Sequence, residues 1–270
     1  MKQKTHFTNW SVSVSIKKQK LAAKVLIFDI ETSPLESFHW GLWDQNIALN
    51  QIKKDWHIMS WAAKWLDEKK VMYQDQRDVK DITNDKKTLE GIWKLLDEAD
   101  VVITQNGKSF DVKKLNARFI MNGMQPPSSF KHIDTKRLAT KHFGFTSNKL
   151  EYMAEKINKK FKKSSHKKFS GLSLWTECLK NNKAAWNEMK KYNIIDVLTT
   201  EELYHNLIPW DSTIDFSIYN PYKKIICSCG STEFKENGHA YYASGVYKRY
   251  KCKSCGKEPK INRTKENRVR

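Results

Sequence analysis

Apolar residues in the first part of the chain occur in short, strand-like runs. KVLIFDI, residues 24–30, is almost continuously apolar, which is typical of a central strand covered on both faces. Two further strands are predicted at 58–66 and 70–76, and the turn-like residues 67–69 between them indicate an antiparallel hairpin. Residues 35–55 carry few periodic signals, so we expect a loop or insertion there.

After residue 88 the pattern alternates between helical periods and short β-branched runs. Helices are expected near 88–99, 110–121, 135–143, 148–157 and 183–206, and strands at 101–104 and 130–133. Pro209 is expected to stop the last helix. Strands that alternate with helices predict an α/β domain, and the early hairpin makes its sheet mixed.

The composition and the periodicity of the chain change between residues 210 and 222. Cysteines, glycines and short strand-like runs such as 241–250 replace the helical periods. We therefore expect an α/β domain followed by a small β domain, with basic ends. The expected segments are a flexible basic arm at 1–23, the α/β domain at 24–210, the β domain at 222–262 and a basic tail at 263–270.

The charge balance indicates a polyanionic partner. The 270 residues hold 49 Lys+Arg against 30 Asp+Glu, a formal net charge of +19, and nucleic acid is the simplest partner for such an excess. Lysines gather before residue 24, at 156–168 and at 251–270. Single charge runs are usually solvated faces, but three together favour salt-sensitive binding to a nucleic-acid backbone.

A membrane location is not expected. No apolar run approaches the roughly 20 residues of a spanning helix. No amphipathic anchor accompanies the basic runs, and residues 1–24 lack the apolar core of a signal peptide. We therefore expect a cytoplasmic protein.

Four carboxylates and one tyrosine are the candidate catalytic residues. Asp29 and Glu31 lie two apart on the predicted first strand, so both point to one face, although most such pairs are solvated. Asp111 stands at a predicted helix start, where an acid ordinarily favours the helix dipole. Tyr192 and Asp196 share one helix face at i, i+4 spacing. If a fold gathers these acids, divalent cations must lie between them.

Taken in order, three segments make a more specific pattern: FDIET at 28–32, NGKSFD at 106–111 and YNIID at 192–196. This chain resembles the DnaQ-like, or DEDD, 3′–5′ exonuclease family of the ribonuclease H-like superfamily. Its Tyr-x-x-x-Asp form is that of the DEDDy subgroup, because the histidine form would need a histidine where Lys191 stands. The resemblance covers about residues 24–206. It implies a mixed five-stranded sheet flanked by helices, in strand order 3-2-1-4-5 with strand 2 antiparallel.

The resemblance also implies a two-metal-ion site for Mg²⁺ or Mn²⁺, whose preferred ligands are oxygens. Asp29, Glu31 and Asp196 would hold the ion that activates water, with Asp29 shared with a second ion that Asp111 supports. Tyr192 would orient the water or help to deprotonate it, and because a free tyrosine has a pKa near 10, orientation is the favoured role at neutral pH unless the metals shift that pKa. Residues expected to contact the terminal nucleotide are Thr32, Asn106 and Phe110.

The cysteines predict a second metal site. Cys178 stands alone and is expected to be a buried thiol. The other four form two pairs, Cys227/Cys229 and Cys252/Cys255, which suit one structural Zn²⁺ in an arrangement that resembles a zinc ribbon. The first pair is C-x-C where C-x-x-C is usual, so His239 is an alternative ligand. Unpaired reduced thiols are the competing interpretation.

The sequence thus predicts a metal-dependent 3′–5′ exonuclease on DNA, single-stranded by preference, with a C-terminal zinc ribbon. Bacteria and their phages are plausible sources. A separate polymerase or repair complex is a candidate partner. Two other interpretations stay open: a ribonuclease or structure-selective endonuclease on the same fold, and an inactive nucleic-acid-binding adaptor.

Overall fold

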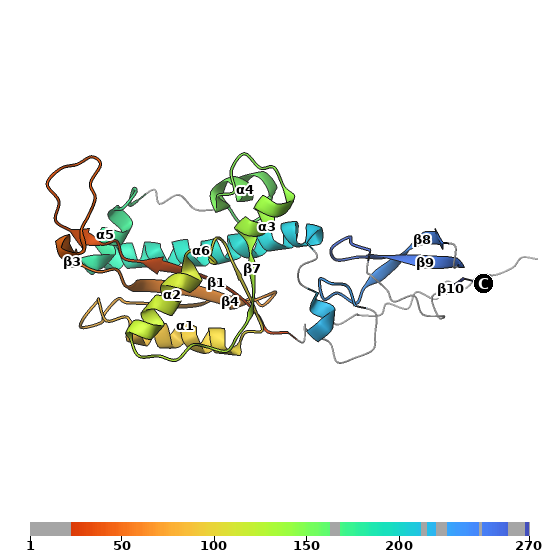
Figure 1. Cartoon of the computed structure of the whole chain (residues 1–270), viewed down its shortest axis with the longest axis horizontal. Helices are drawn as coiled ribbons and strands as arrows, with labels where there is room; N and C mark the ends of the chain where they lie inside the picture. Colours follow the sequence, from red (N-terminus) through yellow and green to blue (C-terminus); the bar gives the residue numbers. More distant parts are fainter. Residues whose placement is uncertain are drawn as a thin grey trace, which may run out of the picture.

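The computed structural model describes residues 23–162, 168–211, 215–219, 226–242, 245–258 and 268–269 (Figure 1). The expected flexible arm lies almost wholly outside this range, as does most of the expected basic tail. Part of the lysine run at 156–168 also lies outside it. No helix within the described ranges is both long and apolar enough to cross a bilayer.

A mixed five-stranded sheet forms the centre of the larger region. Its strands are β1 (Val25–Thr32), β4 (Ile58–Trp65), β5 (Met72–Asp75), β6 (Val101–Thr104) and β7 (Lys131–Asp134). Their spatial order is β5-β4-β1-β6-β7. Strand β4 runs antiparallel to both β1 and β5, while β6 is parallel to β1 and to β7. The predicted mixed sheet and its strand order are confirmed.

Helices cover both faces of this sheet, which explains the continuous apolar run in β1. Leu26 and Phe28 pack in one core with α1 (Lys86–Glu98) and α2 (Asp111–Met121). Ile27 packs in the other core with α3 (Thr135–His142), α4 (Leu150–Ile157) and α6 (Lys183–Leu207). Figure 1 shows α1 and α2 on one side and α6 along the other. Alternate residues of β1 therefore enter different cores.

A third, smaller core joins α6 to α5 (Ser173–Leu179), a helix that the sequence pattern did not delimit. Cys178 and Trp186 are fully buried there, as expected for the lone thiol. Helix α6 ends at Leu207 and passes into a 3₁₀ turn at Ile208–Trp210. Pro209 lies in this turn, where the missing N–H breaks the α-helical ladder.

Residues 35–55 are not simply a loop. Strands β2 (Glu36–Ser37) and β3 (Ile52–Lys54) pair antiparallel, with a 3₁₀ turn at Leu49–Gln51 before β3. The ladder is too short and too exposed to leave a periodic signal in the sequence.

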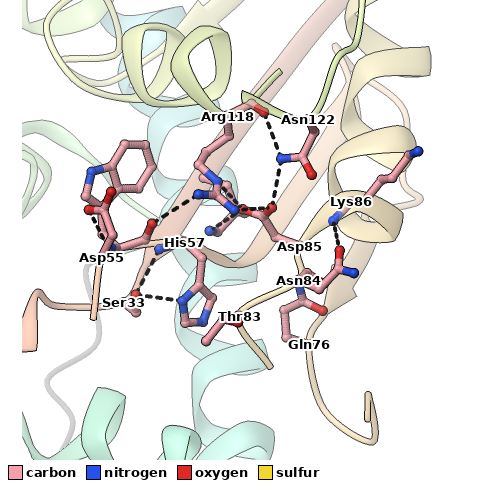
Figure 2. A network of polar contacts seen from close by, with 12 residues as sticks. Ser33, Asp55, His57, Gln76, Thr83, Asn84, Asp85, Lys86, Arg118 and Asn122 are labelled. Carbon is pink, nitrogen blue, oxygen red and sulfur yellow. Dashed lines mark hydrogen bonds and ion pairs between the residues drawn. The ribbon is translucent and has the colours of Figure 1, made fainter. Parts of the chain in front are cut away.

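A buried ion pair fixes α2 against the sheet (Figure 2). Asp85 is fully buried and accepts from Arg118 Nε at 2.8 Å and Nη2 at 2.7 Å. The same carboxylate accepts from the Ile58 amide at 2.9 Å. Breaking such a pair by removing one partner typically costs about 3–5 kcal/mol. Asp85 thus ties the start of β4 to the helix that begins at Asp111.

The C-terminal region is a small antiparallel sheet in the order β10-β9-β8. Strand β8 (Phe234–Tyr242) and β9 (Gly245–Cys252) pair so that Tyr242 faces Gly245. The strand-like run at 241–250 is therefore divided between two strands. Arg268–Val269 forms β10 and pairs with β9, beyond the boundary at 262 that the sequence suggested.

Candidate active site and metal centre

Asp29 and Glu31 lie on β1 and share the face that α6 covers. Asn193 of α6 is fully buried, and its Nδ2 donates to Asp29 Oδ2 at 2.6 Å. The Oδ1 of the same amide accepts from Ser60 Oγ on β4 at 3.2 Å. Asn193 therefore uses both ends of its amide group and holds the Asp29 carboxylate in one orientation.

Glu31 is oriented by a residue of α5. The indole Nε1 of Trp175 donates to Glu31 Oε2 at 3.0 Å. The Trp175 ring also packs edge-on against Tyr192, with the ring centroids 6.1 Å apart. One tryptophan thus contacts both the first and the third sequence segment of the candidate site.

Asp111 is more than a helix-start acid. It lies in the first turn of α2 and is only 3% exposed. Its Oδ1 accepts from the Ile30 amide at 3.2 Å, between the two acids of β1. Burial raises the pKa of Asp111 to about 7, although the hydrogen bond from Ile30 acts the other way. An acid that served only the helix dipole would remain in water.

The loop before Asp111 is held by buried polar groups. The Asp134 carboxylate accepts from the backbone amides of Asn106 at 2.9 Å and Lys108 at 3.0 Å. Asn106 has a φ of 68°, a left-handed conformation that asparagine tolerates. A Cβ on Gly107 would lie 2.3 Å from Thr104 Oγ1, so only glycine fits there.

The three predicted nucleotide contacts belong to the same two segments as Glu31 and Asp111. Phe110 is 38% exposed, directly before Asp111. Thr32 is half-buried at the end of β1, after Glu31. The Asn106 side chain accepts from Lys136 Nζ at 3.2 Å, which engages its carbonyl oxygen within the protein. The contacts with nucleotide themselves stay predictions.

Tyr192 and Asp196 are both buried on α6, at 8% and 4% exposure. Burial raises the pKa of Tyr192 far above its ordinary value, and the charges of Asp196, Glu31 and Asp29 raise it further. The pKa of Tyr192 thus responds to the charges of three of the four candidate carboxylates. Lys191, at the histidine position of the other subgroup, has a side chain that is 77% exposed.

The structure therefore brings together the segments of all five candidate residues. The donors from Ile30, Asn193 and Trp175 are neutral groups, so they orient these carboxylates without compensating their charge. Among the described residues, the acids do not form a group whose oxygens all lie within 4.8 Å of one another. A donor set of carboxylate oxygens spread over several elements suits hard divalent ions.

Sequence reasoning missed Asn193, Trp175 and Asp134. Asn193 lies inside YNIID, and its place beside Tyr192 on a buried helix face was a usable signal. Trp175 and Asp134 had no such signal, because their roles depend on contacts with residues 144 and 28 positions away.

The four C-terminal cysteines form a separate cluster. Their sulfurs all lie within 4.8 Å of one another, and His239 is not a member of the group. Cys227 Sγ is 3.5 Å from Cys255 Sγ, and Cys229 Sγ is 3.7 Å from Cys252 Sγ. Four thiolates around Zn²⁺ at about 2.3 Å would be roughly 3.8 Å apart, so the cluster fits a tetrahedral zinc ion. A disulfide needs about 2.05 Å.

Backbone turns shape the cluster despite the unusual C-x-C spacing. The Gly230 amide donates to the Cys227 carbonyl at 2.8 Å, and the Gly256 amide donates to the Cys252 carbonyl at 2.9 Å. Both glycines have positive φ, at 88° and 75°. The hydrogen bond between Cys227 and Cys229 lowers the pKa of Cys227 and raises the pKa of Cys229.

A further group of potential metal ligands is explained by contacts within the protein. Asp67, Glu201 and His205 also lie within 4.8 Å of one another. Glu201 is paired with the buried ammonium of Lys64 and accepts from the Asp67 amide at 2.9 Å. Its charge is therefore balanced within the protein, and Asp67 and His205 contact each other at 3.2 Å between Oδ1 and Nε2.

Comparisons with known proteins agree with this architecture. The family model of the RNase H superfamily matches residues 26–208. Among solved structures, the chain is similar to the family B DNA polymerase from the hyperthermophilic archaeon Pyrobaculum calidifontis, at 17% sequence identity and a TM-score of 0.51. The match covers 69% of this chain and 25% of the polymerase chain, and at this identity it shows a shared fold. No curated protein matches the chain in sequence.

Proposed function

This chain belongs to the RNase H superfamily, and we propose that it is a metal-dependent 3′–5′ exonuclease of the DEDDy type. Its expected substrate is DNA, single-stranded by preference. The superfamily and the fold support a nuclease that acts on nucleic acid. The polarity of degradation, the choice of DNA and the two-ion mechanism are the proposal.

One observation carries this proposal: three distant segments that bear acids meet around the backbone of residues 29–31. Asp29 and Glu31 come from β1, and the Asp111 carboxylate accepts from the amide between them. From the opposite side, α6 contributes Tyr192 and Asp196, with Asn193 bound to Asp29. Asp111 and Asp196 are buried, and Asp29 and Glu31 are half-buried. Gathering acids in this way is unfavourable without cations, and it is therefore evidence for a site.

Asp29, Glu31 and Asp196 would hold one Mg²⁺ or Mn²⁺, and Asp111 together with Asp29 would hold a second. Two such ions supply Lewis-acid stabilisation for the attacking and leaving oxygens of a phosphodiester. The protein's own contribution is to orient the carboxylates. Asn193 and Trp175 supply this for Asp29 and Glu31 through the hydrogen bonds described above.

Tyr192 would act through its neutral hydroxyl. Because burial and three nearby carboxylates all raise its pKa, the hydroxyl keeps its proton at neutral pH. It can then donate or accept a hydrogen bond and orient a water molecule, while removal of a proton by a tyrosinate is disfavoured. We assign Tyr192 an orienting role.

The C-terminal β domain would be a zinc ribbon that helps to capture substrate. The sulfur geometry supports one structural Zn²⁺ bound by Cys227, Cys229, Cys252 and Cys255. The net charge of +19 supports binding to phosphates.

One assay tests the proposed function. Single-stranded DNA, duplex DNA and RNA, each labelled at the 5′ end, are incubated with the full chain and either Mg²⁺ or Mn²⁺. The proposal expects ladders that shorten from the 3′ end by single nucleotides, fastest on single-stranded DNA. Internal cuts or preferred degradation of RNA would favour the alternative nucleases. Binding without any product would favour an inactive adaptor.

A further inference from the structure

Residues 35–55, here called the aromatic arm, expose large apolar side chains to solvent. Phe38 is 66% exposed, Trp40 101% and Trp43 83%. Of the fifteen exposed large hydrophobic side chains in the described residues, seven belong to the arm. Figure 1 shows this red segment projecting from the end of the molecule where α5 lies. Apolar patches of this kind usually mark an interaction surface.

Hydrogen bonds, rather than a core, shape the arm. The Phe38 amide donates to the Gln51 carbonyl at 2.9 Å, and Gln51 Nε2 donates to the Phe38 carbonyl at 3.0 Å. Gln51 Oε1 also accepts from the Ala48 amide at 2.8 Å. These polar contacts define the backbone while the rings remain outside.

The arm adjoins the candidate active site. Its base is closed by a hydrogen bond from the Ser33 amide to the His57 carbonyl at 2.9 Å, two residues after Glu31. Beside this base, Lys114 Nζ lies 3.6 Å from the centre of the Trp56 ring. The same ammonium is 5.8 Å from the ring of Phe110, which precedes Asp111. Lys114 thus bridges two aromatic rings, one directly after the end of the arm and one directly before Asp111.

The local charge indicates which part of a nucleic acid the arm suits. Its lysines, Lys53 and Lys54, both pair with Glu36, at 3.9 Å and 3.2 Å. Asp44 and Asp55 add two further acids, so the arm is nearly neutral in a chain of charge +19. A neutral aromatic surface suits bases, while the basic remainder of the chain suits phosphates.

We propose that the aromatic arm binds unpaired bases of a single-stranded nucleic acid by stacking, and so holds the strand whose end enters the active site. The proposal rests on the proposed nuclease function. Every base has a π-face, so stacking on Trp40 and Trp43 would serve a strand of any sequence. Such binding suits an enzyme that removes one nucleotide after another.

The test compares a 20-nucleotide dT strand with an abasic strand of equal length. Both carry phosphorothioate linkages, and binding is measured by fluorescence anisotropy without added divalent ions. For the Trp40→Ala, Trp43→Ala double variant we expect binding of dT to weaken by about 30-fold or more, because two base stacks are lost. Affinity for the abasic strand should be unchanged. The Trp40→Phe, Trp43→Phe variant should retain most of the dT affinity.

Trp210→Ala is the matched control, because Trp210 is 65% exposed but lies outside the arm. Its dT affinity should equal that of the wild type. Since stacking does not require a particular sugar, rU strands should lose affinity by a similar factor in the double alanine variant. Unchanged dT affinity in that variant would overturn the proposal, as would an equal loss on the abasic strand.

Sedimentation of the wild type and the double alanine variant tests self-association. A wild-type dimer that the variant no longer forms would assign the arm to a second copy of the chain and overturn the proposal. Hydrolysis by the wild type with Mg²⁺ is measured separately. If the wild type hydrolyses DNA normally and the double alanine variant keeps its dT affinity, only the proposed role of the arm is rejected. If the wild type does not hydrolyse DNA, the proposed function is rejected.

Discussion

The two groups of candidate metal ligands in this protein differ in how closely the ligand atoms lie together and in how much of a core surrounds them. The four cysteine sulfurs lie within 4.8 Å of one another. Among residues 226–242 and 245–258 around them, the buried apolar side chains are those of Cys227 and Cys252. The carboxylates are spread over β1, α2 and α6, inside a domain with two large cores. Ile30, Asn193 and Trp175 orient three of them.

The two regions therefore obtain their stability from different sources. The cysteine region has almost no core of its own, so the proposed zinc ion would supply much of its folding free energy. The carboxylate region is already held by packing and hydrogen bonds, and there the proposed ions would serve catalysis. Metal removal should therefore unfold one region and only inactivate the other.

The largest expected effect is on the cysteine region. Cys252→Ser removes one ligand, and because structural zinc contributes on the order of 10–16 kcal/mol of apparent binding free energy, we expect loss of zinc and unfolding of residues 226–258. Metal analysis and limited proteolysis measure this. Cys178→Ala, which removes a thiol buried elsewhere, should leave the zinc content near one ion per chain. Proteolytic resistance in zinc-free Cys252→Ser would contradict the comparison.

The next effect should be on catalysis without unfolding. Asp29→Asn removes a charged ligand but keeps the shape of the side chain, and we expect hydrolysis to fall by about a thousandfold or more. The thermal unfolding temperature should not fall, because the carboxylate at this site is a source of repulsion. Glu90→Gln, at an exposed position on α1, should keep full activity. Near-normal turnover by Asp29→Asn would remove Asp29 from the site.

A smaller effect is expected at Asn193, which we consider a positioning residue. Asn193→Ala leaves Asp29 and Ser60 without their amide partner, and loss of such supporting contacts typically costs about 10- to 100-fold in metal affinity or activity. The concentration of Mn²⁺ that gives half-maximal activity should rise, while KM for DNA stays close to normal. Ser60→Ala, which removes only the outer hydrogen bond, should have a milder effect. An unchanged metal requirement in Asn193→Ala would leave this residue a purely structural role.

The smallest effect is expected at Tyr192. Tyr192→Phe keeps the ring against Trp175 and removes only the hydroxyl. Turnover should therefore fall by about 10-fold, which corresponds to the free energy of one hydrogen bond. DNA affinity, measured by anisotropy, should change much less than turnover. If the variant turned over at the wild-type rate, Tyr192 would no longer belong among the catalytic residues.

Local sequence patterns were sufficient for most of the elements. The run at 24–30 predicted β1 because both faces of a central strand must be apolar, and the turn-like residues 67–69 placed the β4–β5 hairpin correctly. The order of the strands in the sheet, however, was predicted from the resemblance to the DnaQ-like family and not from local patterns. The arm at 35–55 was missed because its hydrogen bonds join residues such as Phe38 and Gln51 without a repeating pattern.

The sequence by itself determined which residue types were available: acids in three ordered segments, cysteines in two pairs and an excess of lysine. Only the tertiary structure decided what Asp111 does, because its hydrogen bond to the Ile30 amide crosses 81 positions of the chain. The same holds for Trp175 and Glu31, which are 144 positions apart. Periodicity reports how a residue faces its own helix or strand. Contacts between elements depend on how those elements pack, and this information exists only once the chain has folded.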